Sequence, residues 1–220
     1  MTAATQRTQV AIIGGGPAGL LLSHILHRNG IDSIVLERQT RAHVLERIRA
    51  GVLEAGTVAL LREVGLGERM DREGHPHDGS AIAWEGRPRF FIDTKKFTGK
   101  QMMAYGQTSI TEDLYAARDA AGGEVIDEAV HVRLHEVNSD RPYVTYEKEG
   151  SRRIDCDYVA GCDGQHGVSP SSIPVSLRKT YERAIRSAGS ASCRRRRPSR
   201  NSVIAITIAA LRLRRCALRS

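Results

Sequence analysis

Residues 10–22 read VAIIGGGPAGLLL, and this stretch decides the fold. A short run of β-branched residues ends at three glycines, which predicts a buried parallel strand. Leucines and isoleucines then recur at helical spacing, so we expect a helix over 17–29 that an Asn-Gly pair terminates. A second apolar run over 33–37 predicts another strand. Strand, helix and strand within about 30 residues form one βαβ unit.

The glycines of this stretch follow the pattern GxGxxG. Gly14 permits a tight turn, Gly16 lets the backbone approach a pyrophosphate, and Gly19 allows helix and strand to pack closely. The N-terminus of the helix then faces the anion. The second strand ends in Glu37, 18 residues after Gly19, where a carboxylate can accept hydrogen bonds from a ribose. This context favours a dinucleotide site over a glycine-rich turn beside a surface glutamate, and it fits FAD and NAD equally well.

Arginines cluster just beyond the ribose-binding position. Arg38 and Arg41 precede the segment RIRAG at 47–51. Guanidinium groups can form paired hydrogen bonds with the phosphate oxygens of a nucleotide. A solvated basic helix face explains the same pattern equally well, so the sequence leaves both interpretations open.

The rest of the chain up to residue 177 predicts an α/β fold with a Rossmann-like domain and an antiparallel β insertion. We expect a helix over 44–67 and short antiparallel segments over 80–106. A capping box of Ser109 and Glu112 predicts the start of a helix that runs to about Ala121. Alternating apolar and polar residues predict half-exposed strands over 130–137 and 142–149. A last apolar run over 154–164 predicts a strand that leads into a turn.

The basic charge of the chain lies at its C-terminal end. Residues 1–177 hold 20 Lys and Arg against 24 Asp and Glu, whereas residues 178–220 hold 13 against 1, within a total formal charge of +8. We therefore predict an FAD- or NAD-type domain over 1–177 and a basic tail over 178–220. A nucleic-acid-binding arm is the alternative, because Arg194 to Arg197 can contact phosphates. It is disfavoured, since no aromatic residue follows Tyr181 to stack on bases.

Several classes of protein are disfavoured by composition. The four cysteines form no CxxC pair and have no zinc-type histidine spacing, so we expect reduced thiols and no metal. The polar N-terminus predicts no secretory signal. The longest late apolar run, over 203–211, is too short for a membrane span, which needs about 20 residues. We expect a cytoplasmic chain without a membrane partner.

Five segments together resemble the flavoprotein aromatic hydroxylases. They are VAIIGGGPAGLLL, VLERQT, RIRAGVLE, YGQTSITEDL and DCDYVAGCDGQHGVS, in that order. The resemblance extends from about Gln9 to about Arg183, and RIRAGVLE and YVAGCDG are more specific than the glycine motif. It implies an FAD-dependent monooxygenase that uses NADPH and O2 to hydroxylate a phenolic acid, 4-hydroxybenzoate, to 3,4-dihydroxybenzoate. In such enzymes the flavin supplies the oxygen chemistry, and the protein orients the substrate and excludes water.

The resemblance also implies roles for individual residues, although it assigns no catalytic residue within this chain. The residues implied to contact FAD are Gly14, Gly16, Ala18 and Gly19 at the pyrophosphate, Glu37 at the adenosine ribose, Arg47, Ile48, Arg49, Ala50, Gly51, Val52 and Gln107 at the flavin nucleotide, and Asp163 near the FAD chain. Those implied to hold NADPH are Arg38, Arg49 and His166. A type I′ turn at Asp163-Gly164 and a surface imidazole at His166 are the alternatives. Pro170 replaces an expected arginine and His43 a common tyrosine, so NADPH and NADH both stay open.

The resemblance ends near Arg183. The substrate-binding sheet of the family and its second flavin motif are missing from the sequence, which predicts a truncated domain. The family continues with a segment like YPFGWLG, and codons for it that lose one base translate as AIRSAGS, the sequence of residues 184–190. We therefore hypothesise a frameshift near residue 185. We expect the chain alone neither to hydroxylate substrate nor to form a family-type homodimer.

Overall fold

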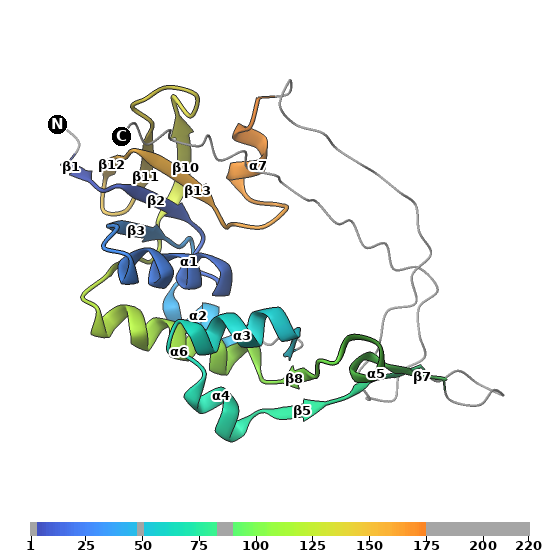
Figure 1. The fold of residues 1–220 in the computed structure, drawn as a ribbon. Helices are drawn as coiled ribbons and strands as arrows, with labels where there is room; N and C mark the ends of the chain where they lie inside the picture. The colour runs from blue at the N-terminus through green and yellow to red at the C-terminus, as the bar shows by residue number, and fades with distance from the viewer. Residues whose placement is uncertain (1–3, 48–50, 83–89, 175–220) are drawn as a thin grey trace, which may run out of the picture.

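The computed structural model describes residues 4–47, 51–82 and 90–174, and the expectations for the basic tail lie outside these ranges. The described chain has three layers, with a parallel sheet between a second sheet on one face and helices on the other (Figure 1). A smaller antiparallel part extends to one side. Within the described ranges, no helix has the length and apolar character that a membrane crossing requires.

The central sheet contains the predicted βαβ unit. Its strands are β13 (Tyr158–Gly161), β2 (Val10–Ile13), β3 (Ser33–Leu36) and β9 (Glu124–Ile126), in that order, and every neighbouring pair is parallel. Helix α1 (Pro17–Arg28) connects β2 to β3. Every residue of β2 and β3 is buried, as expected for parallel strands that are covered on both faces.

The second sheet packs face to face against the central one. It consists of β1 (Ala4–Arg7), β12 (Ser151–Asp155), β11 (Tyr143–Glu147) and β10 (Val130–His135), with β1 parallel to β12 and the other pairs antiparallel. Alternate side chains of the two sheets form one apolar cluster, which includes Ala11, Ile13, Leu36, Val144, Ile154 and Cys156. The thiol of Cys156 is free and buried in this cluster.

The single strand expected over 154–164 is wrong, because the chain passes from one sheet to the other within it. The amide of Thr8 donates to the carbonyl of Asp155 at 3.1 Å, and that of Tyr158 donates to the carbonyl of Gln9 at 3.0 Å. The connection from β1 to β2 and the connection from β12 to β13 thus cross from the second sheet to the central sheet side by side. Their backbone groups stay paired with each other through the crossing. No turn residue is needed there, and the sequence carries no local signal for the break.

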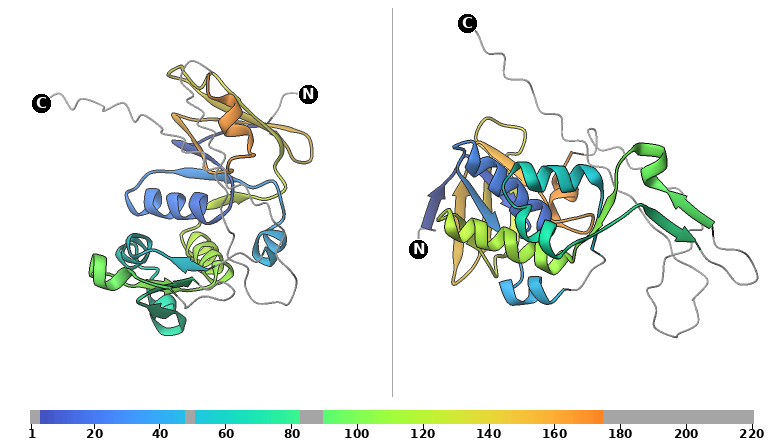
Figure 2. Two further views of the ribbon diagram at one scale, coloured as in Figure 1. Left: turned by 90° about the vertical axis from the view of Figure 1, so that its right-hand side faces the viewer. Right: turned by 60° about the horizontal axis from the view of Figure 1, so that its bottom comes forward.

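Helix α6 (Gln107–Ala120) packs beside α1 on the outer face (Figures 1 and 2). The predicted capping box is wrong, because the N-cap is Gly106 and Ser109 lies inside the first turn. The carboxylate of Glu112 instead accepts a hydrogen bond from Arg69 of α4 (Glu68–Glu73) at 3.0 Å. A tertiary ion pair between two helices has replaced the expected local cap.

The continuous helix expected over 44–67 is also wrong. The structure has α2 (Arg41–Glu46), β4 (Val52–Leu53) and α3 (Ala55–Glu63) instead. The backbone leaves the helical conformation at the C-cap, Arg47, which has a ψ of 90°. Strand β4 then pairs antiparallel with β8 (Met102–Ala104), a partner that helical periodicity cannot reveal.

The antiparallel part lies beside the layered body. β5 (His75–His77) also pairs with β8, and β6 (Gly79–Ile82) pairs with β7 (Phe90–Asp93). Helix α5 (Thr94–Thr98) follows β7, and these elements project outward in Figure 1 and in the right-hand view of Figure 2. A last short helix, α7 (Val168–Ser172), follows β13.

Candidate functional site

The glycine turn, residues 14–16, connects the buried end of β2 to α1. Gly14 has a φ of 108°, and a Cβ added to it would lie 2.6 Å from the carbonyl oxygen of Cys162. A Cβ on Gly19 would collide with the carbonyl oxygen of Gly14. Both positions therefore require glycine. The turn lies at the carboxyl ends of β2 and β13, where open α/β sheets bind their ligands.

Gly16 faces open space. A Cβ added to it would meet nothing within 4 Å, and its φ of −75° is ordinary for any residue. It is the N-cap of α1 and makes no side-chain cap, while Pro17 follows and Ala18 is exposed. The first turn of a helix has N–H groups without intrahelical acceptors, and its dipole favours an anion. The space in front of Gly16 therefore fits a diphosphate.

The carboxylate of Glu37 connects the end of β3 to the glycine turn. Its Oε2 accepts a hydrogen bond from the N–H of Gly15 at 2.7 Å, and its Oε1 accepts one from the N–H of Gln39 at 2.8 Å. The side chain is half-buried at the rim of the turn. A carboxylate has about four acceptor positions, so two remain for the hydroxyls of a ribose.

The loop after β13 borders the same turn. Asp163 follows Cys162 directly, and its Oδ2 accepts a hydrogen bond from the N–H of Ser169 at 2.9 Å. Gly164 has a φ of 75°, whereas Asp163 is not among the described residues with positive φ. A type I′ turn needs positive φ at both central residues, so that alternative is wrong. His166 lies exposed on this loop, with its Nε2 3.0 Å from Nε2 of Gln165.

A second group of expected residues lies at the start of α6. The carbonyl of Gly51 accepts a hydrogen bond from the N–H of Tyr105 at 2.8 Å, and a Cβ on Gly51 would lie 2.7 Å from Cα of Gly106. Val52 is exposed on β4, and Gln107 is the first residue of α6. The structure thus brings Gly51 close to the segment that carries Gln107. The remaining expected flavin contacts, Ile48, Arg49 and Ala50, lie outside the described residues.

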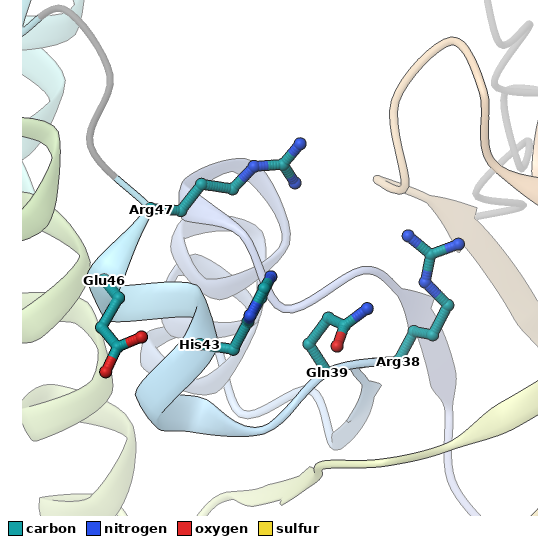
Figure 3. A pocket seen from close by; sticks show the side chains of 5 residues that line it. All are labelled: Arg38, Gln39, His43, Glu46 and Arg47. Carbon is teal, nitrogen blue, oxygen red and sulfur yellow. The ribbon is translucent and has the colours of Figure 1, made fainter.

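A cavity of about 380 Å³ opens beside α2. Its lining residues are Arg38, Gln39, His43, Glu46 and Arg47. In Figure 3 the side chains of Arg38, His43 and Arg47 extend toward the same open space, while that of Glu46 points away. Two guanidinium groups and an imidazole favour an anionic ligand. The sequence interpretation missed Gln39 and Glu46, because the lining combines the loop before α2, the helix itself and its C-cap Arg47.

Arg41 does not line this cavity, although the sequence grouped it with Arg38 and left a phosphate-binding role open for both. Its guanidinium forms an ion pair with Asp119 at 2.7 Å and covers the ring of Tyr115 at 4.3 Å from the centroid. Its backbone N–H donates to Oδ2 of Asp127 at 3.2 Å. These contacts attach the start of α2 to α6 and to the loop after β9.

Two groups in this region have shifted pKa values. Burial raises the pKa of Asp127, and the N–H of Arg41 and the charge of Lys148 oppose that shift. Oδ1 of Asp127 is buried and has no hydrogen-bond partner. Burial also raises the pKa of the Tyr115 hydroxyl, and the negative charges of Asp127 and Glu37 add to the effect. Tyr115 therefore stays protonated and able to donate.

The fold and this site agree with comparisons to known proteins. A family profile described as "FAD binding domain" matches residues 7–204. This match covers most of the chain. The chain belongs to this FAD-binding family. The matched range extends beyond residue 177, where the sequence predicts the domain to end.

Relatives in this family are monooxygenases. The chain is 42% identical over 181 residues to a p-hydroxybenzoate hydroxylase of Acinetobacter baylyi, and the match covers 81% of this chain and 44% of that enzyme. It is 32% identical over 160 residues to a 12-dehydrotetracycline 5-monooxygenase/anhydrotetracycline 6-monooxygenase of Streptomyces rimosus, which covers 72% of this chain and 31% of that enzyme. The chain therefore spans less than half the length of these relatives.

Solved structures have the same fold. The OxyS anhydrotetracycline hydroxylase from Streptomyces rimosus aligns with a TM-score of 0.62 and 27% identity, over 76% of this chain and 33% of that one. The p-nitrophenol 4-monooxygenase PnpA from Pseudomonas putida aligns with a TM-score of 0.65 and 20% identity, over 77% of this chain and 44% of that one. The expected FAD-dependent monooxygenase family is confirmed.

Proposed function

We propose that this chain is the FAD-binding part of an aromatic hydroxylase that converts 4-hydroxybenzoate to 3,4-dihydroxybenzoate with NADPH and O2. The observation that carries the proposal is the 42% identity to a p-hydroxybenzoate hydroxylase over 81% of the chain. The hydroxylation is an activity of the whole enzyme, because the chain spans 44% of that relative.

The glycine turn is the proposed site of the FAD diphosphate. The open space at Gly16 and the N-terminus of α1 suit a negative diphosphate, and the carboxylate of Glu37 can accept hydrogen bonds from the adenosine ribose. Gly14, Ala18, Gly19 and Asp163 complete the proposed contacts. When bound, the flavin supplies the chemistry that activates oxygen. The residues of this chain bind the cofactor, orient it and hold its diphosphate at the helix terminus.

Ligand competition tests this assignment. The full chain is titrated with FAD while flavin fluorescence is recorded, and ADP or FMN is then added as competitor. We expect ADP to displace FAD and FMN to displace it poorly, because the contacts proposed at the glycine turn recognise the adenosine diphosphate part. Equal competition by ADP and FMN, or no binding of FAD, would contradict the proposal.

The cavity beside α2 is the proposed site for the 2′-phosphate of NADPH. Arg38 and Arg47 line it together with His43, and paired arginines suit a phosphate dianion. His166, which is exposed on a different loop, is a weaker candidate contact. The proposed contacts of Ile48, Arg49 and Ala50 with the nucleotides rest only on the family resemblance.

Binding of nucleotide fragments tests the cavity without turnover. We expect 2′-phospho-ADP-ribose to bind the chain more tightly than ADP-ribose, and Arg38→Gln to abolish that difference. Arg28→Gln is the matched control, because Arg28 is an exposed arginine that donates to the carbonyl of Glu63 at 2.8 Å and does not line the cavity. If both fragments bind equally to the unmodified chain, the cavity does not select NADPH.

The aromatic substrate is proposed by similarity alone.

Residues 1–177 are proposed as the FAD-binding region, in which Gly51, Val52 and Gln107 lie near the flavin. Residues 178–220 are proposed as a segment produced by a shifted reading frame. The family match to residue 204 overlaps that segment. Resequencing the DNA across codons 180 to 190 decides the matter, because an intact frame would exclude the shift.

A further inference from the structure

The backbone N–H and the carbonyl of Gly15 both form hydrogen bonds with side chains. Its N–H donates to Oε2 of Glu37 at 2.7 Å. Its carbonyl oxygen lies 3.4 Å from the hydroxyl of Tyr115, which donates a long hydrogen bond to it. Gly15 itself is buried. The central residue of the glycine turn is thus held from β3 on one side and from α6 on the other.

The bond to the carbonyl of Gly15 determines the direction of the next N–H group. The chain has no cis peptide bond among its described residues, and in a planar trans peptide the C=O and the following N–H point in opposite directions. Because the carbonyl of Gly15 points to Tyr115 on α6, the N–H of Gly16 points away from α6. The space around Gly16 is open.

We propose that Tyr115 is a positioning residue that orients the Gly15–Gly16 peptide so that the N–H of Gly16 faces the diphosphate of FAD. The inference rests on the proposed FAD site and adds to it a residue on α6, 100 positions along the chain from the glycine turn. Neither the glycine motif nor the cavity beside α2 contains this residue.

The surroundings of Tyr115 fit this role. Its side chain is 1% exposed, so the ring has little freedom to move. The guanidinium of Arg41 lies over the ring at 4.3 Å and is held by Asp119 at 2.7 Å. This contact covers one face of the ring and, together with the burial, restrains the position of the hydroxyl. Burial keeps the hydroxyl protonated, so it donates over the whole working pH range.

The test removes the hydroxyl and keeps the ring. In Tyr115→Phe we expect the dissociation constant of FAD to rise about two- to threefold, because a hydrogen bond of 3.4 Å lies at the weak end of the usual range. In the cofactor-free chain we expect the amide resonance of Gly16 to shift more than that of any other glycine in a 15N-1H NMR spectrum. Restoring tyrosine restores both values.

Tyr146→Phe is the matched control. Tyr146 is also buried, and its hydroxyl donates a similarly long hydrogen bond of 3.5 Å, to Gln6 in the second sheet. Both variants lose one hydroxyl, so we expect similar small decreases in the thermal midpoint. Only Tyr115→Phe should change FAD affinity and the Gly16 amide. Equal FAD affinities in both variants, with an unmoved Gly16 amide, would overturn the proposal.

The two measurements separate this inference from the proposed function. If the unmodified chain fails to bind FAD, the proposed function fails, and the Gly16 amide still reports whether Tyr115 orients the peptide. If FAD binds equally well to wild type and Tyr115→Phe and the Gly16 amide does not move, the proposed function survives and the positioning role is wrong.

Discussion

Glu37 holds the glycine turn through the backbone of Gly15, whose N–H lies 2.7 Å from Oε2 of the carboxylate. The same carboxylate accepts the N–H of Gln39 at 2.8 Å. A residue expected to bind a ribose thus also shapes the turn that faces the diphosphate. Structure and ligand binding are consequently coupled at this position, and variants of Glu37 should affect both.

Glu37→Ala should destabilise the chain and weaken FAD binding together. The substitution leaves the buried N–H of Gly15 without its acceptor, and an unsatisfied buried donor costs about 1–3 kcal/mol. Glu37→Gln retains one acceptor oxygen for two N–H groups and should lose about half as much. Urea unfolding and FAD titration of the three proteins measure both effects. Unchanged unfolding in both variants would show that the hydrogen bonds contribute nothing.

Gly16→Ala should separate binding from folding. A methyl group there meets no protein atom within 4 Å and needs no unusual φ, so the unfolding free energy should change by less than about 1 kcal/mol. The methyl occupies the space proposed for the diphosphate, and we expect the FAD dissociation constant to rise at least about tenfold. Gly56→Ala is the control, since a Cβ there also meets nothing within 4 Å. It should leave FAD affinity unchanged and raise the unfolding free energy by up to about 1 kcal/mol, because alanine is favoured over glycine within a helix such as α3.

Asp127→Asn should stabilise the chain more at pH 7 than at pH 4. Burial raises the pKa of Asp127 in the folded state, so the folded chain holds this proton more tightly than the unfolded chain. Stability from this group is therefore present at low pH and is lost as pH rises through the folded pKa. The asparagine carries no charge and avoids that loss. Urea midpoints of both proteins between pH 4 and 7 give the comparison.

The control for Asp127 is Asp119→Asn, which removes a carboxylate that is 54% exposed and paired with Arg41. It should not stabilise the chain at pH 7, because it deletes an ion pair and relieves no burial. If Asp127→Asn gave the same stability change at both pH values, titration of Asp127 would not be its cause.

Phe97→Ser should reduce hydrophobic dye binding without loss of stability. Phe97 is 77% exposed on α5, the helix that follows β7 with its exposed Phe90 and Phe91. Exposed aromatic side chains favour association or dye binding. The fluorescence of a bound naphthalene sulfonate dye and the sedimentation coefficient give the readout. Val137→Ser, at an exposed aliphatic position outside β7 and α5, should change neither, and an equal effect in both variants would show that Phe97 is not the site of dye binding.

Local patterns in the sequence were sufficient to predict the βαβ unit. A β-branched run, three glycines and helical spacing predict β2, the turn and α1 because each depends on residues close in sequence. They failed over 44–67, where helical periodicity continues through a segment that β8 pairs into a strand. They failed again at Gln9 and Asp157, where two segments change sheets together.

The sequence by itself determined the dinucleotide-type turn, its pairing with Glu37 at the end of the next strand, and the resemblance to flavoprotein hydroxylases. The tertiary structure decided which other residues reach that turn. The hydroxyl of Tyr115 and the backbone of Asp163 come from segments about 100 and 150 residues away, as their positions next to Gly15 and Gly14 show. Such contacts depend on how helices and strands pack, and no periodicity within one segment encodes them.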